Sequence, residues 1–404
     1  MLVKFFKLTG WAAVAQLLLI IFAPLLTRLY GPSIYGQYGV VVSIASLYAV
    51  VAALRMDILG FRFTSDIRSH KVSGLLAVFT SALILGIAVF FYSEVNAINH
   101  AISLRIWAIC IVAGVFNLAT QWIITSKDYA TYSRVRVWQV FLQVAISLIL
   151  GLKEVSDGLL IGVCSSQIIA SIMLFRKNST LYKKADLVAG LLVLRKEWRF
   201  AIINSLSTVM LYSAPLIPTF LITVNYGTKL AGYYFLCAQI FSAPLSVVRR
   251  ALLNICTAEF SDRSFAVQWL SRNGGKIFKI ALGLSTLSFI LVMVLWFYGE
   301  IILTFVFGSE WVSAGKIAYL VLCLFIVDTC CQPLTNLMSI WGYEKINFML
   351  EICRFIFVVV LPFIVFSFYL LRFTFESYIL YHCATMIIFY FIHAISTYRL
   401  IKTT

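Results

Sequence analysis

The chain has 404 residues, of which 62% are hydrophobic and only 12% are Lys, Arg, Asp or Glu. Soluble domains carry about 25% charged residues, so this composition excludes an ordinary soluble protein and predicts an integral membrane protein. The formal net charge of +16 is strongly basic. Because the basic residues alternate with long neutral stretches, they indicate membrane topology and not a nucleic-acid-binding face.

Twelve nearly uncharged windows follow one another along the chain. The first half contains six of them, at residues 8–27, 29–54, 72–93, 106–126, 137–152 and 158–175. The second half contains the others, at residues 200–228, 230–248, 280–299, 317–343, 355–371 and 377–398. A helix rising ~1.5 Å per residue needs about 20 residues to cross the hydrocarbon layer. The windows therefore predict an all-α integral membrane protein with about twelve transmembrane helices.

The distribution of Lys and Arg predicts the orientation of these helices. If the N-terminus is cytoplasmic and the chain changes sides at each window, all but six of the 32 Lys and Arg lie in the cytoplasm. The exceptions are Arg28, Arg105, Lys153, Lys229, Lys316 and Arg372. Positively charged loops stay on the cytoplasmic side, so we expect a multi-pass protein with both termini in the cytoplasm.

A short repeat relates the two halves of the chain. Residues 30–38 align without gaps on residues 226–234, and both segments read Tyr-Gly-x4-Gly-x-Tyr at the turn after the first window of their half. Chance is the alternative, since Gly and Tyr suit interfacial turns, but the equivalent positions favour a common origin. We therefore expect two parallel six-helix bundles, at residues 1–175 and 200–404, joined by a basic cytoplasmic linker at residues 176–199.

Asp328 is the acid that interrupts a predicted span, and Arg249 and Arg250 follow Pro244 within a helical pattern. A charge inside the membrane needs a partner, a watery cavity or a proton, so Asp328 is a candidate for ion coupling or for a cavity contact. A local polar kink is the structural alternative. One of the adjacent arginines could face a cavity and bind pyrophosphate through its planar fork, while snorkelling to lipid headgroups would explain both.

Other charges lie at the ends of predicted spans. Arg55 and Asp57 close the second span, and Glu351 and Arg354 share one helical face three residues apart. The arginines are candidates for binding an anionic substrate and the acids for ion coupling. Local ion pairs are the simpler explanation for each.

Arg28 could guide an anion or anchor the outer interface. His382 and His393 lie close to three helical turns apart and could relay protons, but ordinary packing is favoured because their helix carries no nearby acid. We find no nucleotide-binding loop, metal-ligand spacing or nucleophile motif, so no catalytic or metal site is expected.

Several segments together resemble one family. Residues 26–38 (LTRLYGPSIYGQY) and 54–57 (LRMD) are similar to the opening of Wzx-type O-antigen flippases and related polysaccharide-biosynthesis membrane proteins. Further similarity lies in AGYY at residues 231–234 with Pro244, FGSEWVSAG at residues 307–315 and IWGYEK at residues 340–345. One departure is Met56-Asp57, where the family often has Tyr-Glu, which puts the role of that acid in question.

The resemblance implies the multidrug/oligosaccharidyl-lipid/polysaccharide exporter superfamily, with two six-helix bundles in a V around a central cavity. It implies a transporter, not an enzyme, that flips an undecaprenyl-pyrophosphate-linked oligosaccharide, such as an O-antigen repeat unit, to the periplasmic leaflet of a bacterial inner membrane. The expected substrate-binding residues are Arg28, Arg55, Arg249, Arg250 and Arg354, and the candidate coupling residues are Asp57, Asp328 and Glu351. No cofactor is expected, and a proton or sodium gradient is the candidate energy source.

The expected partners are the polyprenyl-pyrophosphate-linked glycan and membrane lipids, with a polysaccharide polymerase and chain-length proteins as further candidates and no nucleic acid. A multidrug exporter of the same superfamily is the leading alternative, but its cationic cargo would need an acidic pocket. A membrane-embedded polysaccharide polymerase is disfavoured because the predicted outer loops are short.

Overall fold

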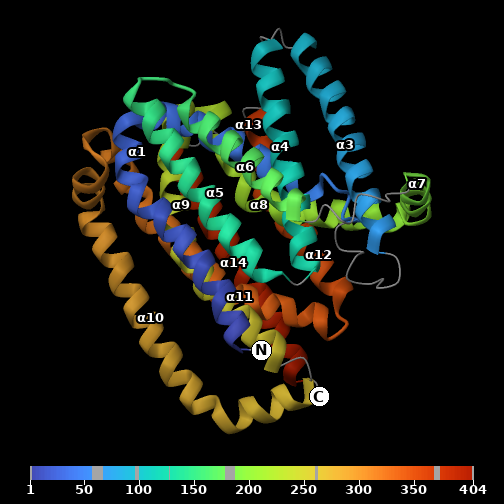
Figure 1. Ribbon diagram of the computed structural model, residues 1–404. Helices are drawn as coiled ribbons and strands as arrows, with labels where there is room; N and C mark the ends of the chain where they lie inside the picture. Colours follow the sequence, from blue (N-terminus) through green and yellow to red (C-terminus); the bar gives the residue numbers. More distant parts are fainter. Residues whose placement is uncertain are drawn as a thin grey trace. The chain divides into compact units, whose positions relative to one another are not determined.

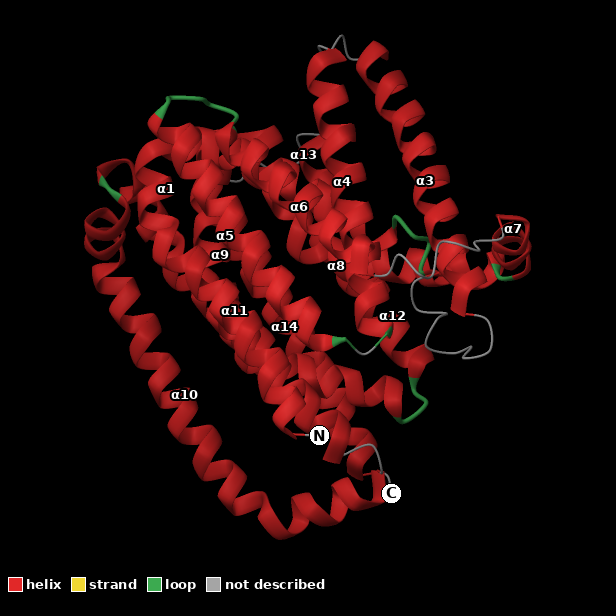
Figure 2. Ribbon diagram, in the orientation of Figure 1, coloured by secondary structure: helices red, strands yellow, loops and turns green. Residues whose placement is uncertain are grey.

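The computed structural model describes residues 2–56, 67–95, 100–126, 128–177, 187–259, 263–367 and 374–402. Within these ranges the chain is nearly all helical and contains no strand (Figure 2). The helices, traced in chain order in Figure 1, are α1 (Leu2–Val51), α3 (Ile67–Val95), α4 (His100–Thr125), α5 (Tyr129–Leu152), α6 (Gly158–Lys177), α7 (Leu187–Lys196), α8 (Trp198–Tyr226), α9 (Thr228–Glu259), α10 (Arg263–Phe307), α11 (Val312–Ile340), α12 (Glu344–Phe355), α13 (Leu361–Ser367) and α14 (Phe375–Lys402). A π-helical turn at Ile356–Val360 joins α12 to α13.

Eleven helical stretches in the described part of the chain are long and apolar enough to cross a membrane. The first, Val14–Val51, is 38 residues long and covers two of the sequence windows. Its helix is broken at Gly31, whose φ of 64° and ψ of 168° lie outside the helical range. At ~1.5 Å per residue the stretch has the length of two crossings. The protein is a multi-pass membrane protein whose eleven stretches account for the twelve windows.

Some boundaries differ from the sequence-based prediction. Between the first and second windows the expected turn is a break within α1 at Gly31, not a separate loop. The apolar stretch of α10 ends at Phe307, later than expected, because its helix continues through Glu300. Within the expected linker, α7 packs against α3, where Val72 and Leu76 surround Gly190. Residues 178–186 of that linker lie outside the described residues.

The chain forms two compact units, residues 1–19 with 38–217 and residues 20–37 with 218–404. These units are not the two halves of the sequence, since residues 20–37 of α1 belong to the second. The bundle boundaries near residues 175 and 200 therefore stay a prediction.

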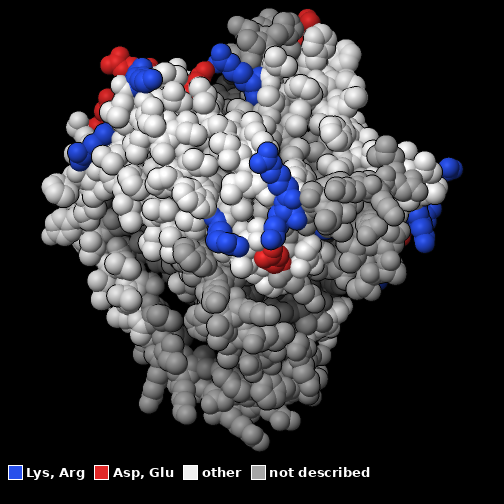
Figure 3. Space-filling model, in the orientation of Figure 1, with Lys and Arg blue, Asp and Glu red and all other residues white. Residues whose placement is uncertain are grey.

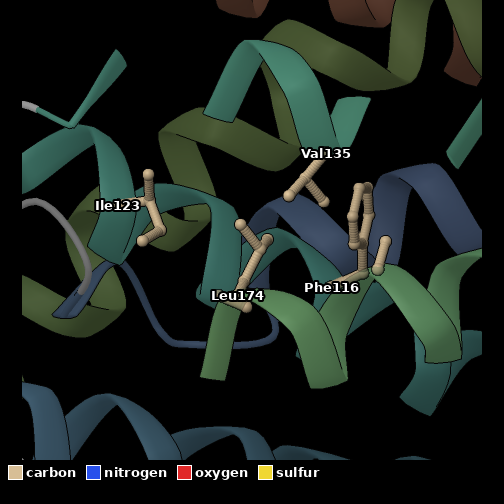
Figure 4. Packing of buried hydrophobic residues seen from close by; sticks show 6 residues of the cluster. Phe116, Ile123, Val135 and Leu174 are labelled. Carbon is tan, nitrogen blue, oxygen red and sulfur yellow. The ribbon is translucent and has the colours of Figure 1, made fainter. Parts of the chain in front are cut away.

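The first unit has an apolar core between α4, α5 and α6. Phe116 and Ile123 of α4, Val135 of α5 and Leu174 of α6 are all buried and contact one another within one cluster (Figure 4). Burying a side chain of this size contributes about 1.5–3 kcal/mol relative to exposure in water. The cluster fixes the ends of these helices that lie near Asp128, the N-cap residue of α5.

The second unit contains a close crossing of the two repeated segments. A Cβ atom added to Gly36 would lie 1.8 Å from the carbonyl oxygen of Thr228, and one added to Gly232 would lie 2.0 Å from that of Pro32. The contact is reciprocal, because Pro32 and Thr228 are equivalent positions of the repeat. Beside it the hydroxyls of Ser33 and Thr228 are 2.9 Å apart. The two repeated glycines therefore have the same structural role: each lacks a side chain and so allows the two backbones to come into contact.

Most of the described surface visible in Figure 3 is uncharged. Exposed apolar side chains are abundant on the span helices, for example Phe79 and Phe91 on α3 and Phe297 and Phe305 on α10. In a membrane protein such a surface faces lipid and not water.

Candidate functional site

An ion pair joins α9 to α11 inside the second unit. Arg249 donates through Nη1 to Oδ2 of Asp328. The side chain of Asp328 is 6% exposed and that of Arg249 is 26% exposed. Asp328 therefore has the partner that a charge within a span requires. Arg250, the next residue along α9, is exposed, as the ~100° step of a helix requires.

A second charge pair lies on α12. Arg354 pairs through Nη2 with Oε2 of Glu351, and both residues are buried. The other carboxylate oxygen, Oε1, is 3.7 Å from Nε2 of His393, which lies on α14 and is 0% exposed. The helical spacing of Glu351 and Arg354 predicts their local ion pair, and the structure contains it.

Tyr390 connects the two pairs. Its ring lies 5.9 Å from the guanidinium of Arg354, and its hydroxyl faces Asp328. Four helices, α9, α11, α12 and α14, therefore contribute to one buried polar cluster, which consists of Arg249, Asp328, Glu351, Arg354, Tyr390 and His393. The two acids of this cluster are each matched by an arginine.

In the first unit, Arg55 occupies a strained turn. Leu54 and Arg55 have φ angles of 49° and 58°, in the left-handed region that side chains other than Gly rarely adopt. Met56, which is 1% exposed, packs with Ala77 of α3 and Ala201 of α8. The burial of Met56 holds the turn in place.

One nitrogen of the Arg55 guanidinium is left without a hydrogen bond in this turn. Its Nε is buried and has no hydrogen-bond partner among the described residues. A buried polar group without a partner is rare and calls for an explanation, and a bound anion is one such explanation. Arg55 is therefore a described arginine whose geometry leaves a place for an anion. Asp57, the acid expected to act beside it, lies outside the described residues.

Arg28 has a structural contact. Its Nη2 donates to the carbonyl oxygens of Phe305 at 3.0 Å and Val306 at 3.3 Å, so it caps the C-terminal end of α10, where a cation is favourable. Whether Arg28 also binds substrate stays a prediction.

Within the part of the chain that the structure describes, no group of three or more His, Cys, Asp or Glu side chains is placed to hold a metal ion. The nine cysteines are free thiols.

A family of known proteins matches most of the chain. The match is to the family described as polysaccharide biosynthesis protein, and it covers residues 25–316. The chain belongs to this polysaccharide biosynthesis protein family. No curated protein matches the sequence.

Solved structures show that this polysaccharide biosynthesis protein has the fold of transporters. A multidrug resistance MATE family transporter of the MOP superfamily, in an inward-facing conformation, is 12% identical with a TM-score of 0.61, and the alignment covers 98% of this chain and 94% of that one. A MATE protein in complex with MaL6 is 14% identical, with a TM-score of 0.57 and coverage of 99% and 96%. A MOP superfamily transporter from Pyrococcus furiosus, described by the reverse polarity of its binding pocket, is 14% identical, with a TM-score of 0.57 and coverage of 99% and 94%.

The sequence did not lead us to expect a functional role for His393 or Tyr390. We treated His393 as packing because its own helix carries no nearby acid, whereas the structure supplies Glu351 from α12. Three-residue spacing places Tyr390 and His393 on the same face of α14, and that spacing was the available signal. The other histidine of this helix, His382, is bonded to the hydroxyl of Tyr234 at 3.3 Å.

Proposed function

We propose that the protein is a flippase that moves a polyprenyl-pyrophosphate-linked oligosaccharide from the cytoplasmic to the periplasmic leaflet of a bacterial inner membrane by alternating access. Membership in a polysaccharide biosynthesis family and the fold of MOP superfamily transporters support a membrane transport step in glycan assembly. A pyrophosphate-sugar headgroup cannot enter hydrocarbon unaided, because burial of its charges and hydroxyls is too costly.

The observation that carries the anionic cargo is the balance of the buried charges within the described spans and in the turn that follows the first one. The buried acids Asp328 and Glu351 are each paired with an arginine, whereas Nε of Arg55 is buried without a partner among the described residues. The two ion pairs are each neutral, so they do not offset the positive charge of Arg55. Arginine suits pyrophosphate, because its planar fork donates paired hydrogen bonds and keeps its charge.

The strained turn at Leu54 and Arg55 supports the same assignment. A non-Gly residue in the left-handed region costs about 1–3 kcal/mol, and such strain is typical of ligand-binding sites. A cation-binding exporter would instead need an unpaired acid. The Pyrococcus furiosus transporter is described by a binding pocket of reverse polarity that suggests a different function, so the polarity of the pocket differs among proteins with this fold.

The test is a flipping assay with purified protein in liposomes that contain a fluorescent polyprenyl-pyrophosphate-linked disaccharide. A membrane-impermeant reductant bleaches only the outer leaflet, so the bleached fraction should rise from about half to nearly all when the wild-type protein is present. We expect Arg55→Ala to abolish this rise and Arg55→Lys to retain part of it, because lysine keeps the charge but loses the fork.

Arg134→Ala is the matched control, because Arg134 is an exposed arginine of the same unit and its loss should leave the rate unchanged. A parallel assay with ethidium tests the multidrug alternative. Movement of ethidium without movement of the disaccharide lipid would identify a multidrug exporter and overturn the proposal.

A further inference from the structure

His393 is a buried titratable group that the proposed substrate contacts do not use. It is 0% exposed, and neither ring nitrogen has a hydrogen-bond partner among the described residues. Its Nε2 lies 3.7 Å from Oε1 of Glu351, which is beyond hydrogen-bond distance but within reach of an ion pair. Buried polar groups normally have hydrogen bonds. The ring of His393 has none here, although a carboxylate oxygen lies only slightly beyond hydrogen-bond distance.

The carboxylate of Glu351 faces two groups of different kinds. Its Oε2 is paired with Arg354, which is always charged, whereas its Oε1 faces His393, which is charged only when it binds a proton. Two cations on one buried carboxylate would leave an uncompensated positive charge in a medium of low dielectric constant. While Arg354 keeps its pair with Glu351, His393 therefore stays neutral.

We propose that Glu351 and His393 form a buried proton-binding site whose occupancy is controlled by Arg354. When an anion neutralises Arg354 or draws it away, Nε2 of His393 takes a proton from a hydronium ion, and the new N–H donates a hydrogen bond to Oε1 of Glu351. One N–H bond forms on His393, and one O–H bond of the hydronium ion breaks to leave water. The inference rests on the proposed function, because the phosphate of the cargo is the anion, and it adds that a proton accompanies this anion.

The other charged and titratable groups of the cluster leave Arg354 as the controlling cation. Besides Glu351 and Arg354 on α12, these groups are Tyr390 on α14, Asp328 on α11 and Arg249 on α9. Arg249 and Asp328 neutralise each other, and the ring of Tyr390 faces the guanidinium of Arg354.

The test is nuclear magnetic resonance of the purified protein labelled with ¹⁵N-histidine, with protons as the only ligand. The chain has four histidines, so the signal of His393 can be assigned from its loss in His393→Gln. In the wild type we expect a neutral ring over about pH 5–8. Arg354→Gln should raise the proton affinity of His393 at least tenfold, whereas Arg354→Lys should behave as the wild type.

The double variant Glu351→Gln/Arg354→Gln should return His393 to the neutral form, because the carboxylate is gone. The signal of His382 should be the same in every variant and reports that the fold is intact. A ring that stays neutral in Arg354→Gln, or that is charged equally in the double variant, overturns the proposal. If Arg354→Gln fails to fold at neutral pH, the proposal requires recovery at low pH, and no recovery overturns it. Since no glycan is used, failure here is separate from failure of the flipping assay.

Discussion

At the scale of single residues, the ion pair between Arg249 and Asp328 explains how α11 tolerates an acid within its span. Asp328 is 4% exposed, and Arg249 reaches it from α9. Removal of one partner from a buried pair leaves the other charge uncompensated, whereas removal of both is often nearly neutral. The pair is thus best tested by changing each residue alone and then both together.

We expect Asp328→Asn and Arg249→Gln each to lower the free energy of unfolding by about 2 kcal/mol. This is less than for a fully buried pair, because a quarter of the Arg249 side chain is exposed. The double variant should recover most of the loss, since neither charge is left alone. Thermal unfolding in detergent micelles gives the stability of the wild type, the two single variants and the double variant.

Transport by the same variants addresses the role of the acid. If Asp328 changes its protonation during transport, the double variant should be stable and yet move no disaccharide lipid in the flipping assay. Wild-type rates in the double variant would make the pair purely structural.

At the scale of helices, the crossing at Gly36 and Gly232 depends on the absence of side chains. A methyl group at either position would overlap the opposite backbone, whose carbonyl oxygens would lie 1.8 Å and 2.0 Å from it. Carbonyl oxygens within helices cannot move aside as the end of a flexible side chain can.

We expect Gly36→Ala and Gly232→Ala each to cost about 1–3 kcal/mol of stability, as overpacking does. Gly283→Ala in α10 is the control, because a Cβ atom there meets nothing within 4 Å and alanine favours a helix. The unfolding temperatures of the three variants in detergent micelles measure this difference in stability. Equal behaviour of all three would mean that the crossing is open in solution.

The start of α5 provides a second test at this scale. Asp128 caps this helix by accepting from the backbone N–H of Thr131 at 3.1 Å and from its hydroxyl at 2.7 Å. The hydroxyl contact is the main reason that the pKa of Asp128 lies below its ordinary value. A lowered pKa in the folded state means that the stabilisation is present above the pKa of the unfolded chain and is lost as pH falls through the folded value.

We therefore expect Asp128→Ala to cost about 1 kcal/mol at neutral pH, as the loss of an N-cap does. The cost should shrink below about pH 4, where the wild-type carboxylate takes up a proton. Asp128→Asn, which keeps a capping oxygen, should show a smaller cost. Unfolding temperatures recorded from neutral to acidic pH test the trend, and a cost independent of pH would contradict it.

At the scale of the whole molecule, the break in α1 decides the topology. If Val14–Val51 crosses twice, reporter fusions after Lys71, Arg136, Lys183 and Lys402 should indicate the cytoplasm. Fusions near Glu94, Lys153 and Arg372 should indicate the outside. If the stretch crossed once, the side of every later fusion would be reversed, so opposite signals at two or more of these sites would exclude twelve crossings.

The span helices could be predicted from the sequence because the cost of placing charges in hydrocarbon is local and additive. Contacts between residues far apart in the sequence could not be predicted in this way. Arg249 and Asp328 are 79 positions apart, and nothing in either helix indicates which charge it will meet. The helix through Glu300 extends beyond its neutral window, because a charge at the membrane surface does not end a helix. By contrast, the pair of Glu351 and Arg354 follows from helical periodicity alone.

The glycine crossing also bears on the origin of the chain. In the contact, position 36 touches position 228 and position 232 touches position 32, and the repeat makes these equivalent pairs. This is the pattern of an isologous interface, in which two identical surfaces meet about a two-fold axis. A half-length ancestor with one copy of the segment would have met a second copy of itself in the same way, as a homodimer. In a single chain the two glycines can mutate separately, yet each still faces the backbone of the other copy.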